Sequence, residues 1–270
     1  MRILLRLYPR EAVAYENDYH YHLQAFVYSL IRKTGRARIH DRAGYKFFCF
    51  SNIFPYQPTF ETGQEENLLI SGPDSVLVSD LARLIKDMEN PELRMGKARF
   101  SIKEVDGPFG LDMRAGSSLK LRSSTPIVVR IPAWRYRDYG IKSDRPYVFW
   151  RDTISLEAFV KQISDNMEKK IAEYDLSKTD VAHKLTGTRE EREGEVCPSK
   201  SDLPDVISYR YLKSVSKPIT VKGESQQVIG SLWEFEFSPQ TVEMARNLEF
   251  VADCGFGERN PLGFGFMNTR

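Results

Sequence analysis

Two Gly-Phe-Gly triplets near the end of the sequence place the strongest constraint on its fold. They occupy residues 255–257 and 263–265, and only five residues follow the second triplet. Glycine is favoured where the backbone needs a positive φ or must come close to another group. With so few residues left after the triplets, we expect a glycine-rich hairpin whose second arm, residues 262–269, is the final strand of a sheet.

This glycine pattern does not fit the common nucleotide-binding loops. A dinucleotide loop needs Gly-x-Gly-x-x-Gly at the start of a helix and an acidic side chain about twenty residues later. Here Asn260 and Pro261 follow the first triplet, and nine residues remain after Pro261. A Walker loop needs Gly-Lys-Ser or Gly-Lys-Thr, which the sequence lacks. We therefore expect no nucleotide cofactor; the alternative is a hairpin that only packs against a bulky group.

The first part of the chain alternates strand and helix patterns. Apolar runs and alternation predict strands, and apolar residues at helical spacing predict helices. The expected strands are 3–7, 45–52, 66–71 and 97–103, and the expected helices are 18–34 and 73–88. Their order is βαββαβ, which is typical of a ferredoxin-like unit.

The second part repeats this order with longer elements. Strands are expected at 118–132, 206–222, 226–237, 250–253 and 262–269, and helices at 153–173 and 239–247. The polar, turn-rich stretch 186–205 is predicted to be a loop or insertion. The fold class expected is α+β, with two tandem ferredoxin-like (RRM-like) domains facing a central cleft. The predicted domains are residues 1–110, with the catalytic site, and residues 111–270, with the glycine-rich loop.

Composition favours a reduced, soluble, cytoplasmic protein. The chain has 270 residues, of which 41% are hydrophobic, enough to form a substantial core. No apolar run approaches the roughly 20 residues needed to span a membrane, and the charged stretch at residues 1–10 does not resemble a signal peptide. The three cysteines are widely spaced and form neither a disulfide framework nor a zinc pattern. We therefore expect no metal and no membrane segment.

Charge is distributed unevenly along the chain, although the formal net charge is only +2. Residues 31–46 hold six basic side chains and one acidic one, and residues 112–151 hold nine basic and three acidic ones. Residues 57–93 show the opposite bias, with eight acidic and two basic side chains. Separate basic zones on a nearly neutral chain favour a path for a polyanion. The alternative is that each zone is an ordinary solvated surface.

Three side chains near the first basic zone are candidate catalytic residues. His40 lies between the first expected helix and the second strand, where neighbouring positive charge disfavours the imidazolium form. A histidine of this kind can act as a general acid or base. Lys46 can supply positive charge to a phosphorane-like transition state, and Tyr28 can donate a hydrogen bond, although a phenol is a weak base candidate.

These candidates have simpler alternatives. His40 can be a solvated loop residue, Lys46 a lysine at a strand end, and Tyr28 a half-buried aromatic of the helix. His20 and His22 are the other histidines in the same part of the sequence, and neither has a metal partner at a recognisable spacing.

Several segments resemble one known family. The segments are RILLRL, HYHLQAFVYSLIRK, RIHDRAGYKFFCFS and CGFGERNPLGFGF. They are similar to the first strand, first helix, catalytic-loop region and glycine-rich loop of the CRISPR-associated endoribonucleases that cut repeat RNA into guide RNAs. This is the Cas6 group of the RAMP superfamily. The similarity in element order extends over essentially the whole chain.

The resemblance implies a reaction and its residues. It implies metal-independent cleavage, in which the 2′-hydroxyl upstream of the scissile bond attacks the phosphate and leaves a cyclic phosphate and a 5′-hydroxyl. The family's acid/base histidine corresponds to His40, and a Tyr–His–Lys site would add Tyr28 and Lys46. Which of the three is acid and which is base stays open. The implied partner is CRISPR repeat RNA, as precursor and as processed guide; a multi-subunit effector complex and a homodimer are left open.

The resemblance and the charge pattern together give a set of RNA-binding candidates. Arginines are plausible phosphate contacts, and aromatic residues such as Trp134 and Tyr136 can stack on unpaired bases. The glycine-rich loop is implied to lie near bound RNA. The candidates are Arg38, Arg42, Arg122, Arg130, Arg135, Arg137, Gly255, Gly257, Arg259, Gly263 and Gly265. Two other interpretations compete with an enzyme: a catalytically inactive repeat-RNA-binding subunit of a CRISPR effector complex, and a two-domain interaction protein with a purely structural glycine loop.

Overall fold

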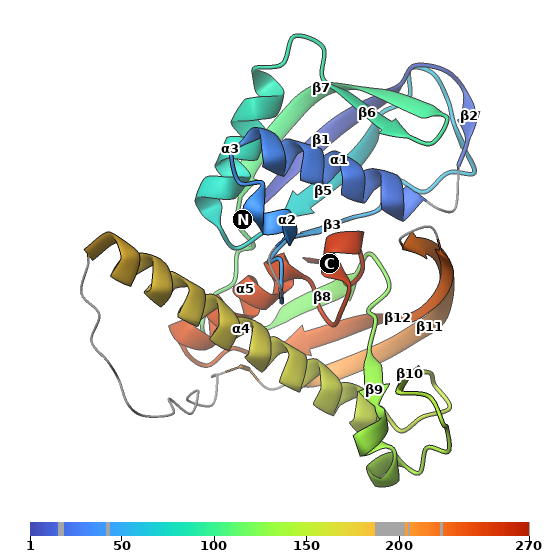
Figure 1. The fold of residues 1–270 in the computed structure, drawn as a ribbon, viewed down its shortest axis with the longest axis vertical. Helices are drawn as coiled ribbons and strands as arrows, with labels where there is room; N and C mark the ends of the chain where they lie inside the picture. The colour runs from blue at the N-terminus through green and yellow to red at the C-terminus, as the bar shows by residue number, and fades with distance from the viewer. Residues whose placement is uncertain (16–18, 42–43, 187–202, 205, 222–223, 270) are drawn as a thin grey trace.

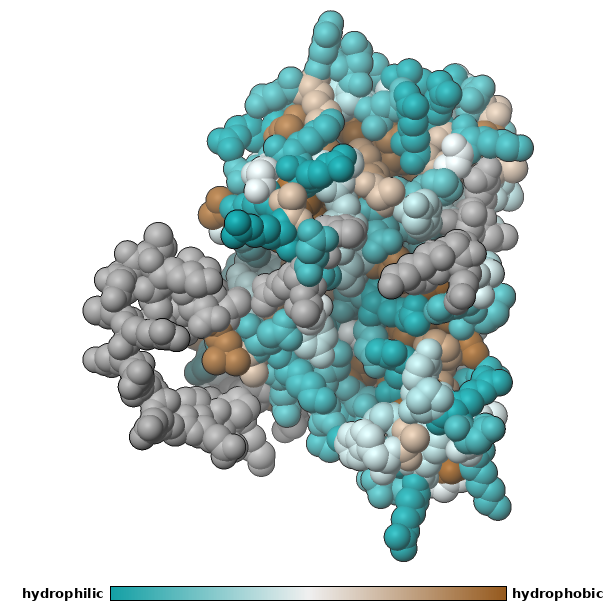
Figure 2. Space-filling view, viewed as in Figure 1, coloured by the Kyte–Doolittle hydropathy of each residue, from teal (hydrophilic) through white to brown (hydrophobic). Residues whose placement is uncertain are grey.

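The structure is a computed structural model that describes residues 1–15, 19–41, 44–186, 203–204, 206–221 and 224–269. Figure 1 shows two units of sheet and helix, one above the other along the long axis. The two ends of the chain both lie near the middle of the picture, where the units meet. Hydrophilic residues predominate on the face shown in Figure 2, over both units.

The first unit is a five-stranded sheet with two helices on one face (Figure 1). Its strand order is β3-β5-β1-β7-β6, and every neighbouring pair is antiparallel. The strands are β1 (Arg2–Pro9), β3 (Cys49–Phe50), β5 (Glu66–Ser71), β6 (Glu92–Met95) and β7 (Ala98–Phe109), and the helices are α1 (Tyr19–Lys33) and α3 (Ser75–Lys86). Apart from the short β6, this is the βαββαβ plan expected from the sequence.

Regular spacing of apolar residues explains this first unit. Ile3, Leu5 and Leu7 alternate along β1 and are fully buried, as expected when one face of a strand meets the core. Helix α1 buries Leu23 and Val27, which lie one turn apart on the same face. These residues belong to a single core that extends through both helices and the sheet.

The second unit repeats the plan with a four-stranded sheet. The strand order is β11-β12-β8-β13, again antiparallel throughout. The strands are β8 (Leu119–Ser123), β11 (Val206–Val221), β12 (Glu224–Phe237) and β13 (Met267–Thr269), and the helices are α4 (Leu156–Thr186) and α5 (Val242–Cys254). In chain order the elements run β8, α4, β11, β12, α5, β13, so the tandem ferredoxin-like fold class predicted from the sequence is confirmed.

Smaller elements decorate both units. Two strand pairs lie outside the main sheets, and one short helix follows α1. These elements are β2 (Val13–Ala14), β4 (Thr59–Phe60), β9 (Arg130–Pro132), β10 (Tyr147–Phe149), α2 (Arg38–Asp41), and the 3-10 turns η1 (Ala133–Arg135), η2 (Arg137–Tyr139) and η3 (Asn260–Leu262). Among the described residues, no helix is both long and apolar enough to cross a membrane.

Some sequence-based elements were wrong in detail. Residues 250–253 belong to α5 and not to a strand, because Leu248 and Val251 continue a helical buried stripe, and a short apolar run does not distinguish the two structures. The expected strand 45–52 is reduced to β3, since Phe47 has a positive φ of 52°. The final strand covers only Met267–Thr269, because Gly263 and Gly265 have left-handed φ values. The expected strand 118–132 divides into β8 and β9.

Other differences concern length and coverage. Strand β6 was not predicted from the sequence, and α4 continues to Thr186 beyond the expected end at 173. Most of the stretch 186–205, and residue 18 at the expected start of the first helix, lie outside the described residues.

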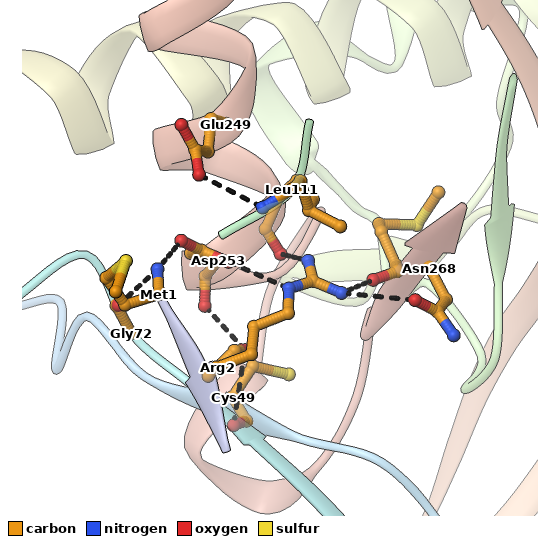
Figure 3. Close-up of polar contacts among 11 residues, drawn as sticks. Met1, Arg2, Cys49, Gly72, Leu111, Glu249, Asp253 and Asn268 are labelled. Atoms are coloured by element: carbon orange, nitrogen blue, oxygen red, sulfur yellow. Dashed lines mark hydrogen bonds and ion pairs between the residues drawn. The ribbon is translucent and has the colours of Figure 1, made fainter. Parts of the chain in front are cut away.

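A buried charged pair joins the two units (Figure 3). The Arg2 side chain, on β1, donates from Nε to Asp253 Oδ1 on α5 at 2.9 Å. It also donates to the backbone oxygens of Met267 at 2.6 Å and Ala252 at 3.2 Å. Burial raises the pKa of Asp253, while Arg2 and the Met1 amino group offset part of that rise. The first strand is thereby fixed to the last helix and the last strand of the second unit.

Candidate functional site

A cavity of about 530 Å³ lies between the two units. Its walls come from α1, from the segment 44–47, from α4 and from the glycine-rich loop. The lining residues include five basic and two acidic side chains, so the cavity favours an anionic ligand. They are Lys46, Arg130, Lys169, Lys170, Arg259, Asp165 and Glu258.

Two of the three catalytic candidates line this cavity. Tyr28 reaches it from α1 and Lys46 from the segment before β3. Burial raises the pKa of Tyr28 to about 12, so its hydroxyl stays protonated at neutral pH. His40 lies in α2, four residues before Gly44 of the cavity wall; its side chain lies outside the described part of the structure.

The glycine-rich loop is tightly packed and buried. The amide of Phe256 donates to Gly265 O at 2.8 Å, and the Gly265 amide donates to Pro126 O at 2.9 Å. Gly265 has φ of +74°, and a Cβ there would overlap the Phe256 carbonyl oxygen. A Cβ on Gly263 would lie 2.5 Å from a ring carbon of Phe50, in the first unit. Glycine is therefore required at both positions by backbone conformation and by close packing.

The aromatic side chains of this loop anchor it in three places. Phe256 lies in the main core of the second unit. Phe264 lies in a small cluster with Val128, and the nearby Phe266 packs against Cys49 of β3. All three phenylalanines are fully buried. The loop is thus a rigid wall of the cavity, and its exposed contribution comes from the turn 258–262.

Lys170 is a cavity residue that the sequence reasoning missed. Its ammonium group donates to Gly255 O at 2.6 Å, Gly257 O at 2.8 Å and Asn260 Oδ1 at 2.7 Å. Burial lowers its pKa to about 8. A signal was present in the sequence: on α4 the buried residues Phe159, Ile163 and Met167 are followed, at helical spacing, by a lysine.

Tyr45 was also missed. It lines the cavity beside Lys46, and burial raises its pKa to about 12. Its hydroxyl accepts from Asn166 Nδ2 at 3.2 Å, and its backbone nitrogen donates to Glu173 Oε1 at 3.0 Å. Both partners lie on α4, so the second unit holds this segment of the first.

The predicted RNA-binding arginines do not all lie together. Arg130 and Arg259 line the cavity, and Arg130 is paired with Glu258 there. Arg135 donates to Asp165 at 2.5 Å and has little exposed surface. The others lie elsewhere: Arg38, Arg122 and Arg137 are exposed outside the cavity, and Arg42 is outside the described residues.

The two aromatic candidates differ in accessibility. Trp134 is 71% exposed, with the Arg135 guanidinium 4.5 Å from its ring centre. Tyr136 is buried in the core of the second unit, and its hydroxyl donates to Arg145 O at 3.0 Å. The expectation that Tyr136 can stack on a base was therefore wrong, because its ring is already packed.

His20, another histidine of the first unit, is not among the residues that line the cavity. His20 is buried, with its ring stacked between Tyr19 and Phe264, and its Nδ1 donates to Leu262 O at 2.8 Å. Burial lowers its pKa to about 4. Within the described ranges, no group of three or more His, Cys, Asp or Glu side chains is arranged to hold a metal ion.

Comparison with known proteins gives relatives over the full chain. The chain is 29% identical to the CRISPR-associated endoribonuclease Cas6 2 of Methanocaldococcus jannaschii, with 99% of both chains covered. It is 26% identical to the CRISPR-associated endoribonuclease Cas6 of Haloferax mediterranei, with 99% of this chain and 93% of that protein covered.

The fold and the family sequence pattern agree with these relatives. A solved structure described as a RAMP protein binding different RNA substrates is similar in fold, with a TM-score of 0.66 at 18% identity, covering 100% of this chain and 99% of that one. The sequence model for the C-terminal part of CRISPR-associated protein Cas6 matches residues 112–269, more than half of the chain. The chain therefore belongs to the Cas6 family.

Proposed function

We propose that this chain is an endoribonuclease that cuts CRISPR precursor RNA within its repeats to give guide RNAs. The observation that carries the proposal is the basic cavity, which Tyr28 and Lys46 line together with the glycine-rich loop. The names of the two relatives, both CRISPR-associated endoribonucleases, support the reaction class. The similar fold of a RAMP protein described as binding RNA supports the ligand.

The proposed reaction is a metal-independent transesterification at phosphorus. A base takes the proton of the 2′-hydroxyl, the 2′-oxygen bonds to phosphorus, and the bond from phosphorus to the 5′-oxygen breaks. An acid then gives a proton to the departing 5′-oxygen. The products are a 2′,3′-cyclic phosphate and a 5′-hydroxyl, so no water or other reactant is consumed.

Three residues divide these tasks in our proposal. His40 transfers a proton, since imidazole titrates near neutral pH. Lys46 stabilises the negative charge that develops on the phosphate oxygens. Tyr28 acts as a hydrogen-bond donor and not as a base, because its pKa of about 12 keeps the phenol protonated.

The two units serve different parts of this function. We assign the catalytic residues to a domain of residues 1–110 and the glycine-rich loop to a domain of residues 111–270. Arg130 and Arg259 are proposed phosphate contacts inside the cavity, and the exposed Arg38, Arg122 and Arg137 extend the path for RNA outside it. The proposed partner is repeat RNA in the cytoplasm, before and after cutting; an effector complex and a homodimer stay predictions.

A cleavage assay with cognate repeat RNA tests the proposal. The assay is run in a chelator such as EDTA, with one RNA that is intact and one with a single 2′-deoxy sugar at the cut site. We expect cleavage of the intact RNA to continue in chelator and to stop with the deoxy RNA. Replacing His40 with alanine is expected to slow cleavage about 10²- to 10⁴-fold, the usual contribution of a positioned acid or base.

Each other outcome would change either the proposed function or the proposed mechanism. Tight, specific binding of the deoxy and intact RNAs without cutting would identify an RNA-binding subunit. Cleavage of the deoxy RNA would rule out attack by the 2′-hydroxyl. Loss of cutting in chelator that returns with added Mg²⁺ would show that the reaction needs a metal ion. Absence of specific RNA binding would exclude both RNA functions.

A further inference from the structure

Lys170 lies at the floor of the cavity with only 1% of its surface exposed. A buried cation is costly unless hydrogen bonds replace its lost hydration. Here the bonds come from one source, since all three acceptors of the ammonium group belong to the segment 255–260 of the glycine-rich loop. The side chain crosses from α4 to that loop.

The number of these bonds limits what Lys170 can do. A lysine ammonium has three N–H donors and no acceptor. Gly255 O, Gly257 O and Asn260 Oδ1 take one each, at 2.6 to 2.8 Å. No donor is left for a phosphate oxygen, so Lys170 does not contact the scissile group directly in this arrangement.

Asn260 links Lys170 to the second glycine triplet through hydrogen bonds. Its Oδ1 accepts from Lys170, while its Nδ2 donates to Phe256 O at 3.1 Å and Phe264 O at 2.9 Å. A single ammonium group therefore supports both triplets and the turn between them. That turn contains Arg259, which has a left-handed φ of 60° and lines the cavity.

The same face of α4 also contacts another wall of the cavity, the segment 44–47. Asn166 and Glu173 lie four residues before and three residues after Lys170, so the three side chains share one face of the helix. Asn166 contacts the Tyr45 hydroxyl, and Glu173 contacts the Tyr45 backbone nitrogen. Tyr45 is adjacent to Lys46, a proposed catalytic residue.

We propose that Lys170 is a positioning residue for RNA cleavage, which acts by fixing the glycine-rich loop at a set distance from the Tyr45–Lys46 segment. Helix α4 is then the common support of the two walls between which the RNA would bind. The effect on cleavage rests on the function proposed above. The hydrogen bonds by which Lys170 fixes the loop do not depend on that function.

The test compares Lys170→Met with Lys169→Met. Methionine keeps the length of the side chain and removes its donors. Lys169 is the neighbouring residue, exposed on the same helix and lining the same cavity, so its replacement removes the same charge without touching the loop. Hydrogen exchange is measured at the amides of Phe256, Glu258 and Gly265, which donate within or from the loop. We expect these amides to lose protection in Lys170→Met and to keep it in Lys169→Met.

Cleavage kinetics then separate positioning from binding. We expect Lys170→Met to lower the single-turnover cleavage rate about 100-fold, the size of effect that a misplacement of about 1 Å can cause. Affinity for the uncleavable 2′-deoxy RNA should change much less than the rate. An equal loss of affinity and rate would show that Lys170 acts on RNA binding and would overturn the proposal, as would unchanged protection of the loop.

A second variant and the exchange experiment test the proposal if Lys170→Met does not fold or if the wild-type protein cuts no RNA. If Lys170→Met does not fold, Lys170→Gln retains donors on a shorter side chain, and we expect partial protection and an intermediate cleavage rate; a glutamine variant with wild-type rate and protection would contradict the proposal. If the wild-type protein cuts no RNA, the proposed function fails, but the exchange experiment still decides whether Lys170 holds the loop.

Discussion

The Arg2 guanidinium donates to the Asp253 carboxylate at 2.9 Å, and the two side chains are 0% and 2% exposed. Removing one partner of such a pair leaves the other charge buried without full compensation. We therefore expect Arg2→Met to lower the free energy of unfolding by about 3 kcal/mol, measured by urea denaturation.

A double variant provides the control for this pair. Arg2→Met combined with Asp253→Leu removes both charges, and we expect it to be more stable than the Arg2→Met single variant because no buried carboxylate that has lost its arginine partner remains. The Asp253→Leu single variant is measured as well. If its effect and that of Arg2→Met add up to the effect of the double variant, the pair does not stabilise the contact between the units.

A second prediction concerns the packing of the glycine-rich loop. Gly265 and Gly116 have similar φ values, +74° and +77°, but a Cβ on Gly265 would overlap a backbone oxygen, whereas one on Gly116 meets nothing within 4 Å. We expect Gly116→Ala to cost about 1 kcal/mol from backbone strain alone and Gly265→Ala to cost well beyond that. Thermal or urea unfolding of the two variants checks this; equal costs would mean that the loop can move away from the clash.

The lowered pKa of His20 predicts that the folded protein loses stability in acid. Its pKa is lowered to about 4 from 6.5, first by burial, and Lys217 adds to the effect. Between these values the unfolded chain binds a proton that the folded chain does not, so stability falls as the pH falls. The stability advantage of the wild type over His20→Asn should therefore shrink from pH 6.5 to pH 4, by up to about 3 kcal/mol.

Urea denaturation at a series of pH values measures this difference. Asparagine does not titrate and can still donate toward Leu262 O, so it isolates the proton-linked part of the effect. A difference that stays constant with pH would show that His20 titrates normally in the folded protein.

Tyr28→Phe tests the assignment of the phenol as a donor. Loss of one donor to developing charge typically costs about 10²- to 10³-fold in rate. Because the pKa of Tyr28 is about 12, its ionisation lies above the range in which cleavage would be assayed. We therefore expect a lower rate with an unchanged shape of the pH–rate profile; a lost basic or acidic limb would make Tyr28 a titrating catalyst.

Arg259→Asn tests the path for RNA inside the cavity. Asparagine tolerates the left-handed backbone that Arg259 adopts, so the change removes charge without straining the turn. Removing one arginine–phosphate interaction should reduce the slope of log affinity against log salt by about 0.7 for single-stranded RNA. Arg114→Gln, on an exposed residue paired with Asp112, is the control and should leave the slope unchanged.

The element order was predictable because it follows from local patterns. Alternation in β1 and helical spacing in α1 and α3 depend on neighbours a few residues apart, and both ferredoxin-like units could be deduced from them. Residues 250–253 were assigned to a strand because the apolar run Phe250, Val251 and Ala252 fits either structure until the burial of Leu248 fixes the helical phase.

The site was less accessible from the sequence, because its contacts join distant residues. Tyr28 and Lys46 were named from the first basic zone, and the structure places both on one cavity. Lys170 and Tyr45 were missed, since their roles depend on α4 lying against a loop 85 residues away in one direction and a segment 128 residues away in the other. Charge counting also could not reveal that Arg135 is paired with Asp165.

The hydrogen bond between Arg2 and Met267 O spans 265 positions of the sequence. During synthesis on the ribosome, the first sheet can form its hydrogen bonds once residue 109 has emerged, but Arg2 has no partner from β13 until residue 267 has been made. The contact between the units is therefore complete only after β13 has been made, and a chain that lacks β13 keeps the Asp253 and Ala252 partners of Arg2 but loses the Met267 O acceptor.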